Sequence, residues 1–266
     1  MNRIWRLFCA GLCVVLALTT SVSAAGPRTV TVDGRPFDLY EPGGSTGQPL
    51  PMIIVLHGAS GNALKMAGFL PLFDFMGTRP FRAAYLNATV FTDATKTSRV
   101  WNDGVCCGDG LRPNVDDSGY VADVIRKLLA EGLVDGPKVA LVGHSNGSQM
   151  AYRVACEHGD LIDAVVAISG AKSGANCVGV AGMRILNIHG KNDTTVPMNG
   201  GSTAKKPQIV HDSIAVAGRS MVDQGATFKL ITVPGAGHKI SSIDQGMQAN
   251  GGIGLPMTIL NFIFGS

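Results

Sequence analysis

A serine stands between two glycines in the segment Gly143-His144-Ser145-Asn146-Gly147. An apolar run predicts a strand over 138–142, and the residues that follow predict a helix over 145–157. In a strand–turn–helix of this kind the serine Oγ projects from a tight turn, and only glycines fit on either side. The helix N-terminus also favours developing negative charge. Ser145 is therefore the predicted nucleophile, and an ordinary Gly-Ser turn is the alternative.

A serine hydroxyl becomes a nucleophile when a histidine accepts its proton. His238 lies in a glycine-rich loop directly after the expected strand 228–233. Functional groups cluster in such loops at the carboxyl ends of strands, so His238 is the predicted base. Two other histidines fit ordinary structural roles, at a helix end and within a helical pattern: His158 and His211.

The base in turn needs a carboxylate to orient it, placed between serine and histidine in chain order. Asp193 follows the expected strand 184–188 by a short loop, with room for a helix and a strand before His238. It is the predicted acid, although a solvated loop aspartate would look the same. Three other aspartates fit less well, at a strand start or on helix surfaces: Asp163, Asp212 and Asp223.

The anionic intermediate of acyl transfer needs two N–H donors. One should be the backbone N–H of Asn146, directly after the nucleophile. The other should come from the loop after an early central strand, where Ala59 is our choice and Ser60 the alternative. His57, in the same loop, precedes Ser145 in the chain and is expected to be structural.

Elements at regular intervals must position these residues. The expected strands are 29–32, 37–40, 52–56, 83–86, 138–142, 164–168, 184–188 and 228–233, and the expected helices are 117–131, 145–157, 209–223 and 257–264. Alternating strands and helices predict an α/β fold with a mainly parallel, doubly wound sheet, and the first two strands predict an N-terminal antiparallel hairpin. No internal repeat or second domain is evident, so residues 26–266 are expected to form one domain.

The first 25 residues have the pattern of a signal peptide, with Arg3 and Arg6 before an apolar run and small residues at its end. We expect cleavage after Ala24 or Ala25 and export to the periplasm or the medium, without stable membrane insertion; an uncleaved anchor is the alternative. Loss of the two arginines leaves 20 of 22 cationic residues against 19 acidic ones. This near balance argues against a nucleic-acid partner.

Four cysteines remain after cleavage, and an even number in an exported protein predicts two disulfides. They are Cys106, Cys107, Cys156 and Cys177. A bond between the two neighbours would close no useful loop, so we expect one of them to bond Cys156 and the other Cys177. A zinc site is the alternative, but the spacing of metal-binding motifs is missing, so no metal is expected.

Several further segments resemble the polyhydroxybutyrate depolymerase and feruloyl esterase family of secreted bacterial esterases. The similar segments are Val55–Gly58, Trp101-Asn102, Cys106–Gly108, Val115–Tyr120, Gly143–Gly147, Met150–Glu157, Ile188–Asp193 and Gly237-His238. The resemblance runs from about residue 30 to the C-terminus. It implies an α/β-hydrolase fold, a Ser-Asp-His triad and no cofactor.

Members of this family cleave esters of hydroxyalkanoates, of hydroxycinnamates on plant polysaccharide, and of acetylated xylan. We therefore expect a secreted serine ester hydrolase acting on small or polymeric hydroxyalkanoate esters, with feruloyl or acetyl xylan esterase as the alternative. The printed sequence shows no polymer-binding module after this domain, so action on a solid should depend on the domain alone. A binding protein on an inactive scaffold, a lipase and a peptidase are further alternatives.

Three other residues have a structural and a functional interpretation each. Trp101 is a candidate substrate-binding residue because it lies in a glycine-rich stretch, with a core position as the alternative. Asp116 and Asp117 stand where a helix should begin, and we expect them to cap it rather than to take part in chemistry.

Overall fold

The computed structural model describes residues 26–45, 47–92, 97–105, 114–136, 139–172, 177–203 and 206–265. The expected signal peptide and the pair Cys106-Cys107 lie outside these residues. None of the helices in the described ranges is long and apolar enough to cross a membrane.

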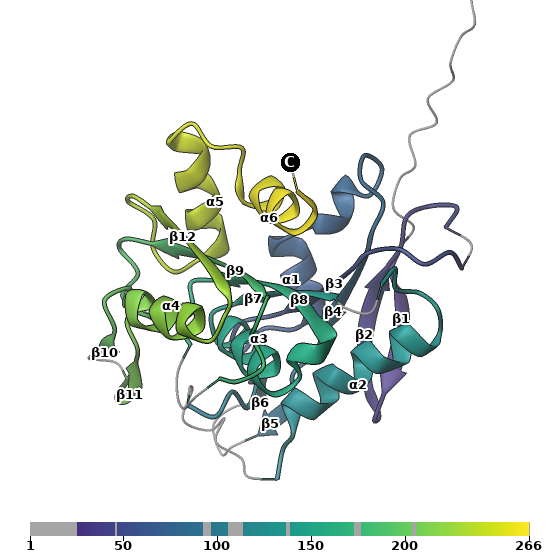
Figure 1. Ribbon diagram of the computed structural model, residues 1–266, viewed down its shortest axis with the longest axis horizontal. Coiled ribbons are helices and arrows are strands. Elements are labelled where there is room, and N and C mark those ends of the chain that lie inside the picture. Colours follow the sequence, from purple (N-terminus) through teal and green to yellow (C-terminus); the bar gives the residue numbers. More distant parts are fainter. Residues whose placement is uncertain are drawn as a thin grey trace, which may run out of the picture.

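An eight-stranded sheet runs through the molecule (Figure 1). Its strands, in spatial order, are β1 (Arg28–Val32), β2 (Arg35–Tyr40), β4 (Arg82–Leu86), β3 (Met52–Leu56), β7 (Val139–His144), β8 (Ile162–Ile168), β9 (Arg184–Gly190) and β12 (Thr227–Val233). The pairs β1–β2 and β2–β4 are antiparallel, whereas pairing from β4 to β12 is parallel throughout. The central strands are apolar and buried on both faces, as a covered parallel sheet requires.

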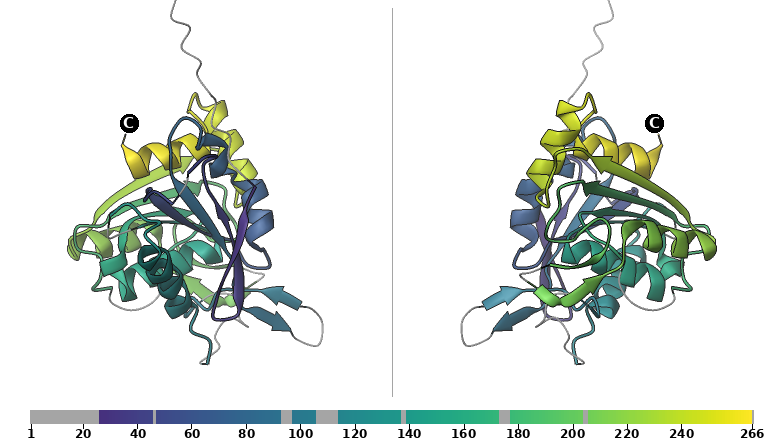
Figure 2. Two further views of the ribbon diagram at one scale, coloured as in Figure 1. Left: turned by 90° about the vertical axis from the view of Figure 1, so that its right-hand side faces the viewer. Right: turned by 90° about the vertical axis from the view of Figure 1, so that its left-hand side faces the viewer.

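Helices cover both faces of this sheet (Figure 2). One face carries α1 (Ala63–Phe69), α5 (Ile240–Ala249) and α6 (Leu255–Phe264), and the other carries α2 (Asp117–Ala130), α3 (Asn146–Glu157) and α4 (Ile214–Asp223). Each face has its own apolar cluster, formed where the buried stripe of the helices meets the strands. The expected doubly wound α/β fold with an N-terminal antiparallel hairpin is confirmed.

The structure adds elements that periodicity did not predict. Helices α1 and α5 were not expected, and two 3-10 turns, η1 (Leu72–Phe75) and η2 (Gly159–Leu161), are present. Two short hairpins also form, β5 (Val90–Thr92) with β6 (Thr97–Arg99) and β10 (Gly201–Thr203) with β11 (Lys206–His211). The helix expected over 209–223 begins only at Ile214, because Ser213 caps it by accepting a hydrogen bond from the Val216 N–H.

The predicted disulfide pairing is wrong. Cys156, in the last turn of α3, bonds Cys177, and the two Cα atoms lie 4.7 Å apart. Neither cysteine is then available to Cys106 or Cys107. The bridge fastens the C-terminal end of α3 to the segment that leads into β9.

Candidate active site

Ser145 lies at the turn between β7 and α3, in the centre of the sheet. Its backbone has φ 55° and ψ −122°, a conformation that an L-residue rarely adopts. The glycines beside it are needed for space. A Cβ on Gly143 would collide with the carbonyl of Gly147, and a Cβ on Gly147 would collide with the carbonyl of Leu56 on β3. The local sequence thus folds into the predicted sharp turn and lifts the serine to the carboxyl edge of the sheet.

Three side chains predicted to act together meet at this edge. His238, in the loop after β12, has its Nε2 atom 2.8 Å from Ser145 Oγ. Its Nδ1 atom lies 2.8 Å from Oδ2 of Asp193, which comes from the loop after β9. Because a carboxylate only accepts, Nδ1 carries the proton and Nε2 is left to accept from the serine hydroxyl. Strands β9 and β12 are parallel neighbours, so their loops emerge side by side.

The carboxylate of Asp193 is buried and well supplied with donors. Its second oxygen accepts from the backbone N–H groups of Thr195 at 2.8 Å and Val196 at 2.9 Å. Burial alone would raise the pKa of Asp193, but the His238 imidazole and these two N–H groups outweigh burial and lower it. The group therefore stays ionised and can orient the imidazole.

The candidate donors for the oxyanion differ in whether their backbone N–H groups are already hydrogen-bonded. Those of Ala59 and Asn146 make no hydrogen bond to any residue in the described part of the chain. The Ser60 N–H, which was the alternative donor to that of Ala59, instead donates a hydrogen bond to the carbonyl of Arg99 at 2.8 Å. The geometry favours Ala59 over Ser60 as the second donor.

The side chain of Asn146 anchors its own backbone. Its Oδ1 accepts from the Trp101 N–H at 2.8 Å, and its Nδ2 donates to the Trp101 carbonyl at 3.1 Å and to Asp103 at 2.8 Å. From the sequence, only the backbone N–H of this residue was expected to take part. A polar side chain at a helix start that is fully buried needs such partners, but no sequence signal identifies them.

Two histidines beside the serine are neutral and structural. His57 accepts from the Ala88 N–H at its Nε2 and donates from Nδ1 to the Gly58 carbonyl, as expected for a structural residue. His144 donates from Nε2 to the backbone carbonyl of His238 at 3.0 Å, and the two rings lie 5.2 Å apart. Burial lowers the pKa of each to about 4. His144 thus ties the nucleophile turn to the loop of the predicted base, a link that sequence reasoning missed.

A pocket of about 850 Å³ opens over Ser145 and His238. It is formed by the loop after β3, α1, the loop after β9, β11 and the start of α5. Its apolar walls come from Met66, Phe69, Val196, Ile209 and Ile240, and its polar lining includes Lys65, Thr195, His211, Lys239 and Ser241. The helical pattern expected around His211 had placed this residue away from the site, whereas it ends β11 and lines the pocket.

Trp101 does not line this pocket. Its side chain is fully buried in the core between the sheet, α2 and α3, and its indole N–H donates to the His57 carbonyl at 2.9 Å. The substrate-binding interpretation is therefore corrected to the core alternative. Asp116 caps α2 through the Gly119 N–H, as expected.

Asp117 has a larger role than capping. It is fully buried, pairs with Arg35 at 2.8 Å, and accepts from Thr89 and from the Asn102 N–H. It therefore holds the segment that carries Trp101, and it takes no part in the pocket.

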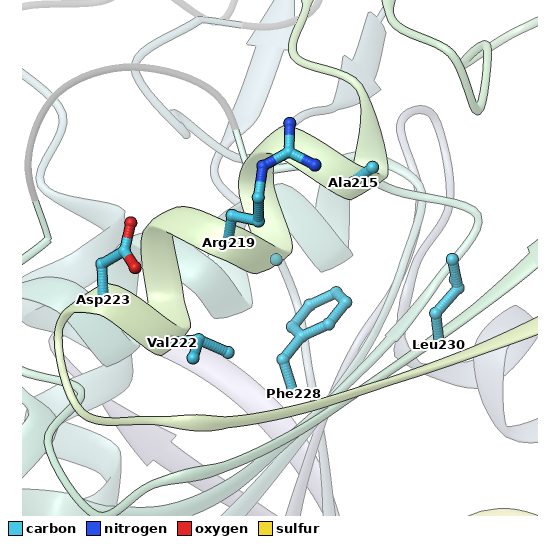
Figure 3. Close-up of a pocket in the computed structure, with 7 residues that line it drawn as sticks. Ala215, Arg219, Val222, Asp223, Phe228 and Leu230 are labelled. Carbon is cyan, nitrogen blue, oxygen red and sulfur yellow. The ribbon is translucent and has the colours of Figure 1, made fainter.

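A second depression lies between α4 and β12 (Figure 3). It is shallow, about 340 Å³, and the Phe228 ring lies below Arg219 and beside Val222. Asp223 sits at its rim, and neither a nucleophile nor a histidine lines it. Within the described ranges, no three His, Cys, Asp or Glu side chains gather as they would around a metal ion. Of these two pockets, the one over Ser145 contains the reactive groups.

Known proteins resemble this chain in sequence and in structure. NocK of Nocardia uniformis subsp. tsuyamanensis, provisionally named an esterase, is 30% identical over 66% of this chain and 51% of its own length. Feruloyl esterase B of Piromyces equi is 28% identical over 60% of this chain and 29% of its own. The chain thus spans about half or less of these relatives.

A carboxylesterase of Mesorhizobium loti superposes with a TM-score of 0.57 over 86% of this chain and the whole of that one, at 14% identity. At this identity the likeness concerns the fold alone, which is that of α/β hydrolases. The profile of the family described as "Esterase PHB depolymerase" matches residues 36–214, from β2 to the start of α4. This chain belongs to the PHB depolymerase esterase family.

Proposed function

We propose that the chain is a serine hydrolase of carboxylic esters that acts through an acyl-enzyme on Ser145. The observation that carries the proposal is the continuous hydrogen-bonded line from Ser145 through His238 to Asp193, with 2.8 Å at each step. This is the arrangement that activates a serine hydroxyl. An inactive binding scaffold would have no use for it.

In the acylation step, His238 Nε2 takes the hydroxyl proton while Ser145 Oγ forms a bond to the ester carbonyl carbon. The carbonyl oxygen becomes an oxyanion, which the N–H groups of Asn146 and Ala59 would stabilise. As the intermediate collapses, the bond to the alcohol oxygen breaks and His238 returns its proton to that oxygen. The alcohol leaves, and the acyl group stays on Ser145.

In the deacylation step, the same imidazole takes a proton from water, whose oxygen attacks the acyl carbon. Collapse of the second intermediate releases the carboxylic acid and returns the proton to Ser145. Asp193 keeps the proton of His238 on Nδ1 in both steps and stabilises the imidazolium that forms.

For the substrate we favour hydroxyalkanoate esters of the polyhydroxybutyrate type. The family match and the apolar walls of the pocket support a short aliphatic acyl chain. Feruloyl or acetyl xylan esters are the second candidate, because a relative bears the name feruloyl esterase. Comparison of kcat/KM on 4-nitrophenyl esters, methyl ferulate, acetylated xylan and a hydroxybutyrate oligomer distinguishes the two; a preference for methyl ferulate or acetylated xylan would overturn our choice.

Replacement of the nucleophile tests the mechanism. Ser145→Ala should lower kcat on the order of 10⁶-fold, as in other serine hydrolases, because no other group can form the acyl-enzyme. The fold should survive, since alanine is smaller than serine, and circular dichroism with thermal unfolding checks this. Retention of more than a tenth of the wild-type rate would remove Ser145 from the mechanism.

Export is part of the proposal. The bridge between Cys156 and Cys177 is typical of proteins that fold in an oxidising compartment, and the N-terminal 25 residues have the pattern of a cleaved signal. N-terminal sequencing of the protein recovered outside the cytoplasm should begin after Ala24 or Ala25. An N-terminus at Met1 on the exported protein would contradict cleavage.

A further inference from the structure

We propose that Lys65 and Lys239 make the pocket selective for esters that carry a free carboxylate at a distance from the scissile bond. This inference rests on the proposed function of the same pocket and names its substrate class. An oligomer of a hydroxyalkanoate fits the description, because it has an apolar repeating chain and one terminal carboxylate.

The two lysines reach the pocket from separate elements on one face of the sheet. Lys65 is in the first turn of α1, directly after the loop that holds Ala59. Lys239 follows His238 and stands at the start of α5. Helices α1 and α5 lie on the same side of the sheet (Figure 2) and share an apolar cluster. Both lysines line the pocket that opens over Ser145.

Neither ammonium group has a protein counter-charge. Both lysines are exposed, and in the described part of the chain neither side chain forms an ion pair or a hydrogen bond. Lys127 on α2 shows the ordinary alternative, an ion pair with Glu131 at 2.7 Å. The charges of Lys65 and Lys239 are thus available to a ligand.

The rest of the lining leaves this positive charge uncompensated. None of the described residues around the pocket is an aspartate or a glutamate. Asp193 lies behind His238, and its charge is taken up by the imidazole and by two backbone N–H groups. A pocket lined by charges of one sign with apolar walls raises the local concentration of oppositely charged ligands.

Apolar side chains line the same pocket as the two lysines. Met66 and Phe69 follow Lys65 along α1, and Ile240 follows Lys239. Phe69 is 66% exposed, so its ring offers apolar surface to a ligand in the pocket. A molecule with a short aliphatic chain and a terminal anion matches this pattern, with its ester at Ser145 and its carboxylate at the lysines.

Solvent screens exposed charges, which sets the size of the effect. Pairs of this kind contribute up to about fivefold in binding each. The selectivity of the wild-type protein should therefore fall about fivefold when one lysine is neutralised and on the order of tenfold or more when both are. Added salt should weaken the preference in the same direction.

The experiment compares matched anionic and neutral esters on one protein. One pair is the mono-4-nitrophenyl ester of adipic acid and 4-nitrophenyl hexanoate, with the carboxylate on the acyl side. A second pair is the 3-hydroxybutyrate dimer and its methyl ester, with the carboxylate on the alcohol side. The measured quantity is the ratio of kcat/KM within each pair, which cancels any effect of Lys239 on the neighbouring His238.

Wild type is compared with Lys65→Gln, with Lys239→Gln and with the double variant. Lys229→Gln is the matched control, because Lys229 is exposed on β12, away from the pocket. We expect the wild type to prefer the anionic member of at least one pair, with the preference lost in the double variant and kept in the control. An unchanged ratio in the double variant, or an equal loss in the control, would overturn the inference.

Binding without turnover separates this inference from the proposed function. Adipate should bind wild-type protein more tightly than its diamide does in titration calorimetry, and the double variant should lose that difference. If the neutral esters are hydrolysed but the double variant still distinguishes adipate from the diamide, the lysine inference fails alone. If no ester is hydrolysed while the difference depends on the lysines, the proposed activity fails alone.

Discussion

The imidazole of His238 is held by partners that are not equivalent. Ser145 shares a proton with Nε2, whereas Asp193 fixes the proton on Nδ1. An amide in place of the carboxylate could donate a hydrogen to Nδ1, which would put the imidazole in the wrong tautomer. This substitution would therefore alter the protonation of the imidazole and leave the shape of the site almost unchanged.

Asp193→Asn should therefore lower kcat roughly 10⁴-fold on a 4-nitrophenyl ester. Asp223→Asn is the matched control, because Asp223 is an exposed aspartate at the end of α4, on the rim of the shallow depression in Figure 3. The kcat of the Asp223→Asn variant should stay within about twofold of the wild-type value. A damaging Asp223→Asn with a harmless Asp193→Asn would show that the acid is misassigned.

At the scale of single residues, chain order and motif predicted more than composition did. The order serine, aspartate, histidine and the loops after expected strands identified three side chains that the structure brings together. Trp101 was misjudged because a glycine-rich neighbourhood does not report burial. His144 was missed because its partner, the carbonyl of His238, lies 94 residues away in the sequence, and spacing does not reveal such a contact.

The turn that carries Ser145 depends on two glycines for space. Gly147→Ala would drive a Cβ into the carbonyl of Leu56, so β3 and α3 could not keep their separation. We expect the free energy of unfolding to fall by at least about 2 kcal/mol, as for other overpacked sites. Urea unfolding of the variant and of the wild type measures this difference in the free energy of unfolding.

Gly68→Ala is the control for this experiment. Gly68 lies in α1, and a Cβ there would meet nothing within 4 Å. Alanine in a helix is favoured over glycine, so stability should rise by up to about 1 kcal/mol. If Gly147→Ala left the free energy of unfolding unchanged, the turn would have to relax in a way that the structure does not show.

The bridge from Cys156 to Cys177 closes a loop of 21 residues that contains β8. Loss of such a bridge frees the unfolded chain, at a cost of about 3 kcal/mol in the loop-entropy account. The double variant Cys156→Ala/Cys177→Ala should show this loss in urea unfolding, with esterase activity retained at low temperature. A loss below about 0.5 kcal/mol would show that the bridge adds little beyond the packing around it.

At the scale of elements, the central strands were predictable and two helices were not. A short apolar run such as that of β3, rich in β-branched residues and followed by a glycine-rich loop, favours a strand over a helix. Helix α1 has seven residues, too few for a helical period to stand out, and α5 has no side-chain cap at its start. The C-terminal part of β11, where a helix was expected to begin, instead belongs to an antiparallel hairpin in which His211 pairs with Gly201. This pairing outweighs the helical pattern, which continues into α4.

For the whole molecule, buried neutral histidines set a response to acid. Burial is the main cause that lowers the pKa of both His57 and His144 to about 4, against 6.5 for a free imidazole. Between these values the unfolded chain binds protons that the folded chain does not. Stability therefore falls as the pH decreases from about 6.5 to about 4, by a few kcal/mol in total.

Urea unfolding at several pH values between 7.5 and 4.5 measures this dependence. Variants His57→Gln and His144→Gln should each show a shallower dependence on pH, whatever their stability at pH 7.5. Slopes parallel to that of wild type in both variants would mean that other groups cause the acid response.

The order in which the sheet is assembled has a consequence for synthesis. The serine stands on the central strand β7, whereas its base follows β12, the edge strand and the last of the sheet in chain order. His144 reaches across 94 residues to the carbonyl of His238, so the loop of the base is held only after that strand has joined. A nascent chain emerging from the ribosome or a translocation channel thus presents its serine without a proton acceptor. If Ser145 and His238 act as proposed, hydrolysis can begin only after the final strand has been added.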